Sequence, residues 1–315
     1  DTKMPEILSI GERMIELFSD EPIEMADTFT RSLAGDSFNI LVAAQRLGTS
    51  TGYMTRLGED PFAEYLLRTW QGEGIDTSRV MKVPGFNAVH FVALLSGGER
   101  EFVYYRKGSA PSTMKPSDLD SDYIGQARIQ HLSGITQAIS SNARKTVLKA
   151  AQIAKDRGVA VSYDPNYRHQ LWSHHEARPA MQEVIPYVDY FLPNAPVDSQ
   201  MLLGTDDPYE VVAYFRNKNV PVVAVTRGEY GAVVGVGDRI IEIEAYLPGG
   251  TIDTTAAGDA FNGGFLHGIL SGSDVGDAAQ LGSVTAGLKL RGRGALAGMP
   301  FQEEVYGVYE RLRQV

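Results

Sequence analysis

Residues 251–266, Thr-Ile-Asp-Thr-Thr-Ala-Ala-Gly-Asp-Ala-Phe-Asn-Gly-Gly-Phe-Leu, decide the fold of this chain. Their small residues allow a tight turn, and apolar residues from Phe261 onward recur at helical spacing. The segment therefore predicts a loop that opens directly into a helix N-terminus. Free backbone N–H groups and the helix dipole make such an end an anion site. We expect the backbone of Ala256, Ala257 and Gly258 to hold a phosphate.

Asp259 falls in the first turn of that predicted helix. A carboxylate beside an anion site is electrostatically unfavourable unless it has a chemical role. The role available is to accept a proton from a hydroxyl that attacks a bound phosphoryl group. The alternative is that Asp259 only interacts with the helix dipole, as acidic residues in first turns commonly do.

The segment resembles the Asp-Thr-x-Gly-Ala-Gly-Asp signature of the ribokinase-like (PfkB) carbohydrate kinase family, with Ala256 where the family usually has a glycine. We expect a negative φ at Ala256, because a methyl group is tolerated there. The resemblance implies phosphoryl transfer from ATP to a sugar hydroxyl, with Asp259 as the base. It also implies that Mg²⁺ bridges the donor phosphates, while Arg168 and the loop amides stabilise the charge that develops.

Composition limits the possible functions. The 315 residues, 43% of them hydrophobic, can bury a large core, and we favour one large α/β domain over two smaller ones. A formal net charge of −10 and the lack of a Lys/Arg run argue against a nucleic-acid partner. With no cysteine, disulfides and thiolate metal sites are excluded. No signal pattern or long apolar run is evident, so we expect a cytoplasmic protein without a membrane partner.

Strand-like and helical patterns alternate along most of the chain. This alternation is typical of βαβ units and predicts an α/β fold with a doubly wound, mostly parallel sheet. The expected strands are 6–10, 51–56, 129–133, 159–163, 190–192, 221–226 and 232–236, with helices at 40–47, 140–157 and 208–218.

Residues 12–34 and 86–107 interrupt this alternation. The second segment reads as a β-hairpin with a glycine turn. We expect both segments to form a small β-sheet lid beside a core of residues 1–11, 35–85 and 108–315. The resemblance implies that the lid covers the sugar and pairs with the lid of another subunit, which would make the protein a homo-oligomer.

Residues expected to bind the sugar follow the first strand. Ligands of such sheets bind at the carboxyl ends of the strands, and Gly11 lies directly after one. The run from Ala34 to Asn39 resembles the family's Gly-Gly-x-x-x-Asn sugar motif, which implies that Gly35, Asp36 and Asn39 contact the sugar. Asp36 is alternatively an N-cap of the next helix, and both roles can hold together.

Two segments suggest an acid sugar. Tyr105 and Arg106 end the hairpin, and Asp-Pro-Asn-Tyr-Arg at 164–168 supplies Asn166 and Arg168. Within the family these segments resemble 2-keto-3-deoxygluconate kinases, and an arginine fork suits a carboxylate. Alternatively, Arg168 serves the phosphate alone and Arg106 is an ordinary exposed residue. Fructokinases share the pattern at 164–168, so a neutral-sugar kinase stays open.

The resemblance also implies a nucleotide site. Thr226, Gly228 and Gly231 match the family's Thr-x-Gly-x-x-Gly element, which is alternatively a hairpin turn. Ser283 and Gly287 lie on a helix face of small residues that matches the adenine wall, and a helix contact explains that face equally well.

The metal-associated element departs from the family. Asn194 resembles the first residue of the Asn-x-x-Glu element, but Val197 stands three residues later, so Asp198 takes the place of the glutamate. The resemblance implies an indirect contact of Asp198 with magnesium. The sequence leaves open a monovalent-cation requirement near Asp253.

The sequence disfavours two other classes of function. An inactive sugar sensor could keep this fold, but Asp259 and its loop would have no role in it. A nicotinamide enzyme is disfavoured because no Gly-x-Gly-x-x-Gly follows the first strand.

Overall fold

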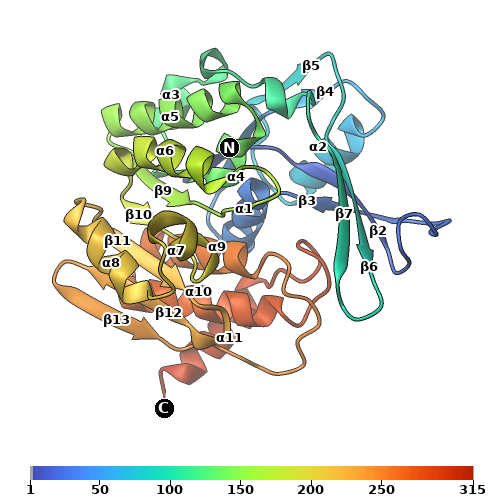
Figure 1. Ribbon diagram of the computed structural model, residues 1–315. Coiled ribbons are helices and arrows are strands. Elements are labelled where there is room, and N and C mark those ends of the chain that lie inside the picture. The colour runs from blue at the N-terminus through green and yellow to red at the C-terminus, as the bar shows by residue number, and fades with distance from the viewer. Residues whose placement is uncertain (1–2, 315) are drawn as a thin grey trace.

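A nine-stranded sheet runs through the larger part of the molecule, in the order β13-β12-β11-β10-β9-β8-β1-β4-β5 (Figure 1). The computed structural model describes residues 3–314. In this sheet order, the strands from β11 through β1 to β5 pair in parallel, whereas β12 and β13 pair antiparallel at one edge. The prediction of a mostly parallel α/β sheet is therefore confirmed. The strands are β1 Ile7–Ile10, β4 Thr51–Gly58, β5 Val80–Val83, β8 Ile129–Ser133, β9 Ala160–Asp164, β10 Tyr190–Phe191, β11 Val222–Thr226, β12 Ala232–Val236 and β13 Arg239–Ile243.

Helices cover both faces of this sheet (Figure 1). Because side chains alternate along a strand, Ile7 and Leu8 of β1 enter two different hydrophobic clusters. The cluster around Leu8 includes residues of α5, α6 and α8, whereas that around Ile7 includes α1, α2, α9 and α10. The helices are α1 Asp36–Arg46, α2 Ala63–Gly72, α3 Ser121–Gly125, α4 Gly134–Ile139, α5 Ser141–Asp156, α6 His174–Val184, α7 Val197–Leu203, α8 Pro208–Asn217, α9 Ala257–Leu270, α10 Val275–Lys289 and α11 Gln302–Leu312, with short 3-10 turns at Pro111–Thr113, Pro116–Asp118, Ile185–Tyr187 and Gly228–Tyr230.

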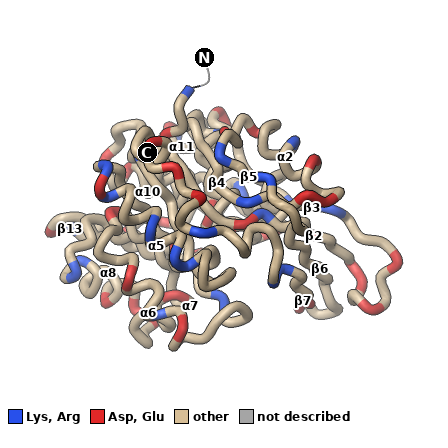
Figure 2. Tube along the Cα trace, turned by 90° about the horizontal axis from the view of Figure 1, so that it is seen from above, with Lys and Arg blue, Asp and Glu red and all other residues tan. Residues whose placement is uncertain are grey.

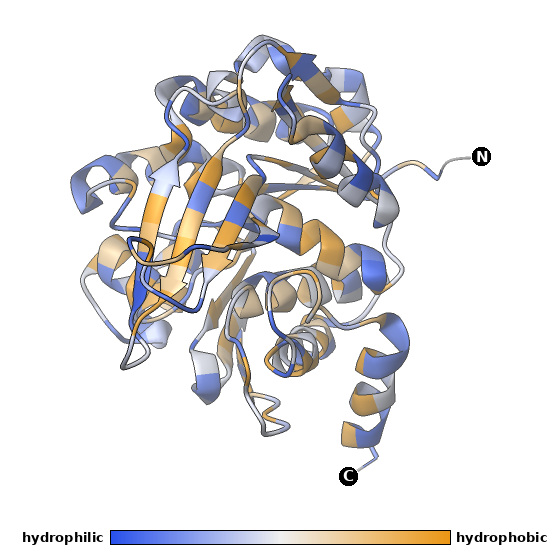
Figure 3. Ribbon diagram, turned by 90° about the vertical axis from the view of Figure 1, so that its right-hand side faces the viewer, coloured by the Kyte–Doolittle hydropathy of each residue, from blue (hydrophilic) through white to orange (hydrophobic). Residues whose placement is uncertain are grey.

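A smaller four-stranded sheet stands beside the larger one, in the order β3-β2-β6-β7 (Figure 1). Its strands are β2 Met14–Ser19, β3 Thr30–Ala34, β6 Val89–Leu94 and β7 Arg100–Tyr105. All four lie within the ranges expected for the lid, and β6 and β7 form the expected antiparallel hairpin. Figure 3 views this side of the molecule and shows broad hydrophobic bands along the strands. Pairing of two lids stays a prediction.

Within residues 3–314, every helix is too short or too polar to cross a bilayer. Acidic and basic residues are interspersed along the trace (Figure 2).

Helix α9 is packed tightly between α1 and α10. A β-carbon built on Gly263 would lie 2.4 Å from Ala43 Cβ and 2.9 Å from the Ile40 carbonyl oxygen, both on α1. On the other side, a β-carbon on Gly264 would lie 2.5 Å from Thr285 Oγ1 of α10. The glycines therefore let the backbones of neighbouring helices approach each other, and this contact holds α1 and α9 side by side.

We predict that Gly263→Ala lowers the free energy of unfolding by about 1–3 kcal/mol, because the added methyl group overpacks the contact between α1 and α9. The matched control is Gly307→Ala in α11, where a β-carbon would meet only Arg311 Nη1, at 3.8 Å. That substitution should stabilise the protein by about 0.5–1 kcal/mol, since alanine favours helix. Denaturant unfolding measures both. Similar effects of the two variants would contradict the packing argument.

Candidate active site

The predicted anion loop ends where α9 begins. Ala256 is the N-cap and Ala257 the first helical residue, so the predicted loop and helix N-terminus are confirmed. The Ala257 N–H donates to the Thr254 carbonyl at 3.2 Å, and the following N–H groups lie in the first turn, where the helix supplies no acceptor. A β-carbon built on Gly258 would meet nothing within 4 Å. The backbone there is open to a ligand.

The backbone of Ala256 differs from expectation. Its φ is 61° and its ψ is 16°, in the left-handed region, so the expected negative φ is wrong. The turn is held by hydrogen bonds from the Thr255 N–H to the Asp253 carboxylate and from the Ala257 N–H to the Thr254 carbonyl. A left-handed alanine costs about 1–2 kcal/mol and persists where the surrounding structure enforces it. This explains why a glycine would suit the position.

Asp259 is held by α1. The residue is 9% exposed, and Asn39 Nδ2 donates to Asp259 Oδ2 at 2.9 Å. Arg13, which is fully buried, donates in turn to Asn39 Oδ1 and to the Gly35 carbonyl. The side chains therefore form a chain of hydrogen bonds from Arg13 through Asn39 to Asp259.

The surroundings of Asp259 change its proton affinity. Burial and the neighbouring charge of Asp36 raise the pKa of Asp259 to about 7. The hydrogen bond from Asn39 and the positive charges of Arg168 and Arg13 oppose this rise. A carboxyl group with this pKa can take up and release a proton near neutral pH, as a general base must.

Three more aspartates gather near Asp259. Asp36, Asp164 and Asp198 are all buried. Burial and the charges of Asp198, Asp36 and Asp259 raise the pKa of Asp164 well above its ordinary value. Asn166 Nδ2 donates to Asp36 Oδ2 at 3.0 Å, so Asn166 is brought to this cluster. The cluster is strongly acidic, with Arg168 and Arg13 as nearby positive charges.

Asp36 does not act as an N-cap. Helix α1 begins at Asp36 itself, and the N-cap is Gly35, with φ of 139°. Instead, Asp36 accepts hydrogen bonds from Asn166 and from the Ser133 hydroxyl. A β-carbon on Gly11 would lie 2.1 Å from Ser37 Oγ and one on Gly35 would lie 2.5 Å from the Glu12 carbonyl oxygen, so close packing requires both glycines. Their predicted contact with sugar stays a prediction.

One face of the lid turns a polar row toward the site. Ser32, Glu16, His90 and Tyr104 are in register across its four strands. Burial raises the pKa of Tyr104, and the charge of the exposed Arg168 opposes the rise. Arg168 lowers the pKa of Asp259 as well. The charge of Arg168 therefore acts both on the polar row of the lid and on the proposed base.

Tyr105 is not brought to that face. As the neighbour of Tyr104 in β7 it points to the opposite side, where it packs edge-on against Phe91 and is 60% exposed. Tyr105 therefore does not share the polar face with Tyr104, and its predicted contact with the sugar stays a prediction. Alternation along the hairpin was the available signal, but the sequence does not show which face covers the site.

Arg106 has an internal partner. It forms a buried ion pair with Glu12, whose side chain is 2% exposed against 11% for Arg106. Arg106 Nε and Glu12 Oε2 have no hydrogen-bond partner among residues 3–314. Arg106 is therefore not the exposed strand-end residue of the alternative interpretation, and its predicted contact with a substrate carboxylate stays a prediction. Sequence reasoning missed both Glu12 and Arg13, although both lie within three residues of the end of the first strand.

The expected nucleotide elements serve local packing. Gly228 and Gly231 have positive φ in the turn from β11 to β12, the hairpin of the alternative interpretation. Ser283 donates to the Glu244 carbonyl at 2.7 Å, and a β-carbon on Gly287 would lie 2.0 Å from the Tyr246 carbonyl oxygen. The small-residue face of α10 therefore packs against the segment after β13. A nucleotide role for these residues, and for Thr226 at the end of β11, stays a prediction.

Asp198 is held by backbone groups. Its Oδ1 accepts from the Tyr167 N–H at 2.8 Å and its Oδ2 from the Asn194 N–H at 2.9 Å, while Asn194 Oδ1 accepts from the Asp198 N–H at 3.0 Å. Both carboxylate oxygens thus accept a backbone hydrogen bond, and the predicted indirect contact of Asp198 with Mg²⁺ stays a prediction. Residues 3–314 hold no group of three or more His, Cys, Asp or Glu side chains suited to a metal ion.

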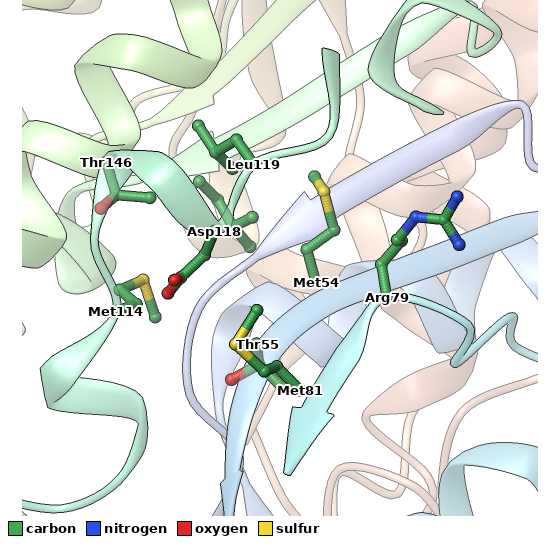
Figure 4. Close-up of a pocket in the computed structure, with 9 residues that line it drawn as sticks. Met54, Thr55, Arg79, Met81, Met114, Asp118, Leu119 and Thr146 are labelled. Carbon is green, nitrogen blue, oxygen red and sulfur yellow. The ribbon is translucent and has the colours of Figure 1, made fainter. Parts of the chain in front are cut away.

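A small pocket lies apart from these residues (Figure 4). Met54, Met81, Met114 and Leu119 supply much of its lining, together with Asp118. The Asp118 carboxylate pairs with Arg56 at 2.6 Å. None of the predicted site residues lines it.

The raised pKa of Asp259 predicts a pH-dependent stability. In the unfolded chain aspartate ionises near pH 3.9, so the native state loses stability as the pH rises from about 4 to about 7. Asp259→Asn should therefore raise the free energy of unfolding by a few kcal/mol at pH 8, and by much less at pH 4. Denaturant unfolding at pH 4 and at pH 8 measures these free energies. The charge-matched control Asp238→Asn, at an exposed turn, should change little at either pH; an equal effect of Asp259→Asn at pH 4 and pH 8 would contradict the shift.

Comparison with known proteins gives concordant matches. The sequence model described as pfkB family carbohydrate kinase matches residues 4–302. A 2-dehydro-3-deoxygluconokinase of Thermoproteus tenax is 33% identical over 307 residues, which is 96% of this chain and 93% of that protein. Fructokinase-1 of Oryza sativa subsp. japonica is 30% identical, covering 96% of this chain and 97% of that protein. A solved sugar kinase of Pyrococcus horikoshii in complex with ATP superposes with a TM-score of 0.79 at 27% identity, covering 95% and 96% of the two chains.

Proposed function

Because the chain belongs to the pfkB family of carbohydrate kinases and is thus a sugar kinase, we propose that it transfers the γ-phosphoryl group of ATP to the terminal hydroxyl of 2-keto-3-deoxygluconate. The observation that carries phosphoryl transfer is the position of Asp259, a carboxyl group with a pKa of about 7 in the first turn of α9, directly beside open backbone amides. The related Thermoproteus tenax and Pyrococcus horikoshii kinases support the substrate class and the donor.

The proposed chemistry assigns each group one task. Asp259 accepts the hydroxyl proton while the hydroxyl oxygen forms a bond to the γ-phosphorus and the bond from that phosphorus to the bridging oxygen of ADP breaks. The amides of residues 256–258 and the exposed Arg168 stabilise the negative charge on the phosphoryl oxygens. Mg²⁺ bound with the nucleotide would supply positive charge to the donor phosphates, and Asp198 would act on it only indirectly. The lid, with Tyr104 and His90 facing the site, would exclude water.

A neutral ketose is the second candidate substrate. The rice fructokinase is nearly as similar to this chain as the 2-dehydro-3-deoxygluconokinases are. The Glu12–Arg106 pair also favours a neutral sugar, because the charge of Arg106 is already balanced inside the protein. An acid sugar requires either Arg168 or an Arg106 that leaves Glu12 when the substrate carboxylate arrives.

Asp259→Asn should lower kcat by roughly 10²–10⁴-fold, the usual contribution of a general base, and leave the fold intact. In the parent enzyme, kcat/KM should rise as the pH increases through about 7, because only the deprotonated carboxylate of Asp259 accepts a proton. Steady-state kinetics with each sugar of a panel measure both quantities. Activity of the variant within a few-fold of the parent would remove Asp259 from the mechanism.

The substrate class is tested with 2-keto-3-deoxygluconate and fructose in parallel. Arg106→Ala should raise KM for the acid sugar roughly 10- to 150-fold and scarcely affect fructose, since only the acid offers a carboxylate. Glu12→Gln, which frees Arg106, should lower KM for the acid sugar alone. Arg168→Ala should reduce kcat for both sugars, because its partner is the shared phosphoryl group.

Equal losses with both sugars in the Arg106 variant would argue against a carboxylate contact. Turnover of fructose well above that of the acid sugar by the parent enzyme would replace the proposed substrate with a neutral ketose.

A further inference from the structure

Lys289 is a buried lysine that the mechanism above does not use. It stands at the end of α10, and its side chain is 0% exposed. Lys289 Nζ donates to the Gly292 carbonyl oxygen at 3.1 Å and reaches the Asp253 carbonyl oxygen at 3.5 Å. A buried ammonium is unfavourable unless polar groups surround it, so these carbonyl groups are part of its stabilisation.

The two carbonyl groups belong to loops that meet at this point. The N–H groups of Ile252 and Asp253 donate to the Leu290 carbonyl at 2.8 and 3.2 Å. The Asp253 carboxylate accepts from the Gly294 N–H at 2.8 Å and from the Thr255 N–H at 2.9 Å. The loop that precedes α9 is therefore tied to the loop that follows α10.

Asp253 stays ionised in this setting. Burial alone would raise the pKa of Asp253, but hydrogen bonds from Thr255 and Gly294 and the charge of Lys289 outweigh it and lower the pKa to about 2. Arg100 at the start of β7 approaches the same carboxylate at 3.5 Å from the lid. The contact between the loop before α9 and the loop after α10 thus contains one buried ammonium, one carboxylate and carbonyl oxygens from both loops.

This arrangement controls the shape of the anion loop. The Asp253 carboxylate fixes the N–H of Thr255, which directly precedes the left-handed Ala256 and the open amides of α9. Lys289 holds the carbonyl of the same Asp253 from the other side. Displacing either contact would let the turn at residues 254–256 relax and would misplace the amides.

We propose that the Lys289 ammonium is a built-in cation that holds the anion loop in its binding shape, so that this kinase needs no free monovalent cation beside Asp253. Carbonyl oxygens of two loops around one positive charge form the kind of coordination that a potassium ion also takes. Here the charge is covalently attached, and a second cation at the same oxygens would be repelled by it. The residues around Asp253 therefore do not fit a free cation. The inference rests on the chain being a sugar kinase and not on which sugar it uses.

The test compares the parent with Lys289→Ala, which leaves space for an ion, and Lys289→Met, which fills the space without charge. Each full chain is examined in KCl, NH₄Cl, NaCl and tetramethylammonium chloride at equal ionic strength. Two quantities are measured: the rise in melting temperature on adding magnesium ATP, which needs no sugar, and turnover of whichever sugar is accepted.

The parent should behave alike in all four salts. In tetramethylammonium chloride, Lys289→Ala should lose roughly tenfold or more of its turnover and much of the rise in melting temperature that ATP causes. In KCl or NH₄Cl it should regain both. Lys289→Met should lose both and regain neither. Activation of the parent several-fold by potassium would overturn the proposal, and so would identical behaviour of the two variants in every salt. If both variants fail to fold, the salt series on the parent still decides it. Failure of the sugar assignment would leave the ATP-induced shift measurable.

Discussion

The hydrogen bond from Asn39 to Asp259 joins the first turns of two helices that lie 220 residues apart in the chain. Asp36, Asp198 and Asp259 each stand in the first turn of a helix, α1, α7 and α9 respectively. The N-terminal end of a helix carries partial positive charge, which stabilises a nearby carboxylate. Three helix ends can therefore stabilise three buried carboxylates, which would be unfavourable in purely apolar surroundings. The acidic cluster thus depends on helix placement, and helix placement depends on the glycine contacts between α1, α9 and α10.

The periodicity of apolar residues was sufficient to predict the architecture, because each strand or helix buries residues at its own regular spacing. Alternating βαβ patterns predicted the large sheet, and the two interrupting segments predicted the smaller one. β5 and β13 were missed because they are short strands toward the edges of the sheet, with partly exposed residues and a weak pattern. The loop into α9 was predictable because a run of small residues and apolar residues at helical spacing lie in one contiguous stretch.

Other features of the site depend on neighbours that are distant in sequence. Nothing local shows that Glu12 faces Arg106 or that Arg13 reaches Asn39, since both contacts form only when the two sheets are placed together. The residues that share one face of the small sheet are likewise set by strand pairing, which puts Tyr104 and not Tyr105 in register with His90 and Glu16. The left-handed Ala256 arises in the same way, from ties between its loop and the loop after α10.

Only Gly11, Glu12 and Arg13 separate β1 of the large sheet from β2 of the small one. The hinge between the two sheets therefore carries an acid that pairs with the end of β7 and a guanidinium that bonds the residue holding Asp259. The positive charge of Arg13 lowers the pKa of Asp259, so the connection between the sheets and the proton affinity of Asp259 are physically linked. A substitution in this connection that displaces Arg13 would therefore change both the packing of the small sheet and the pH at which Asp259 ionises.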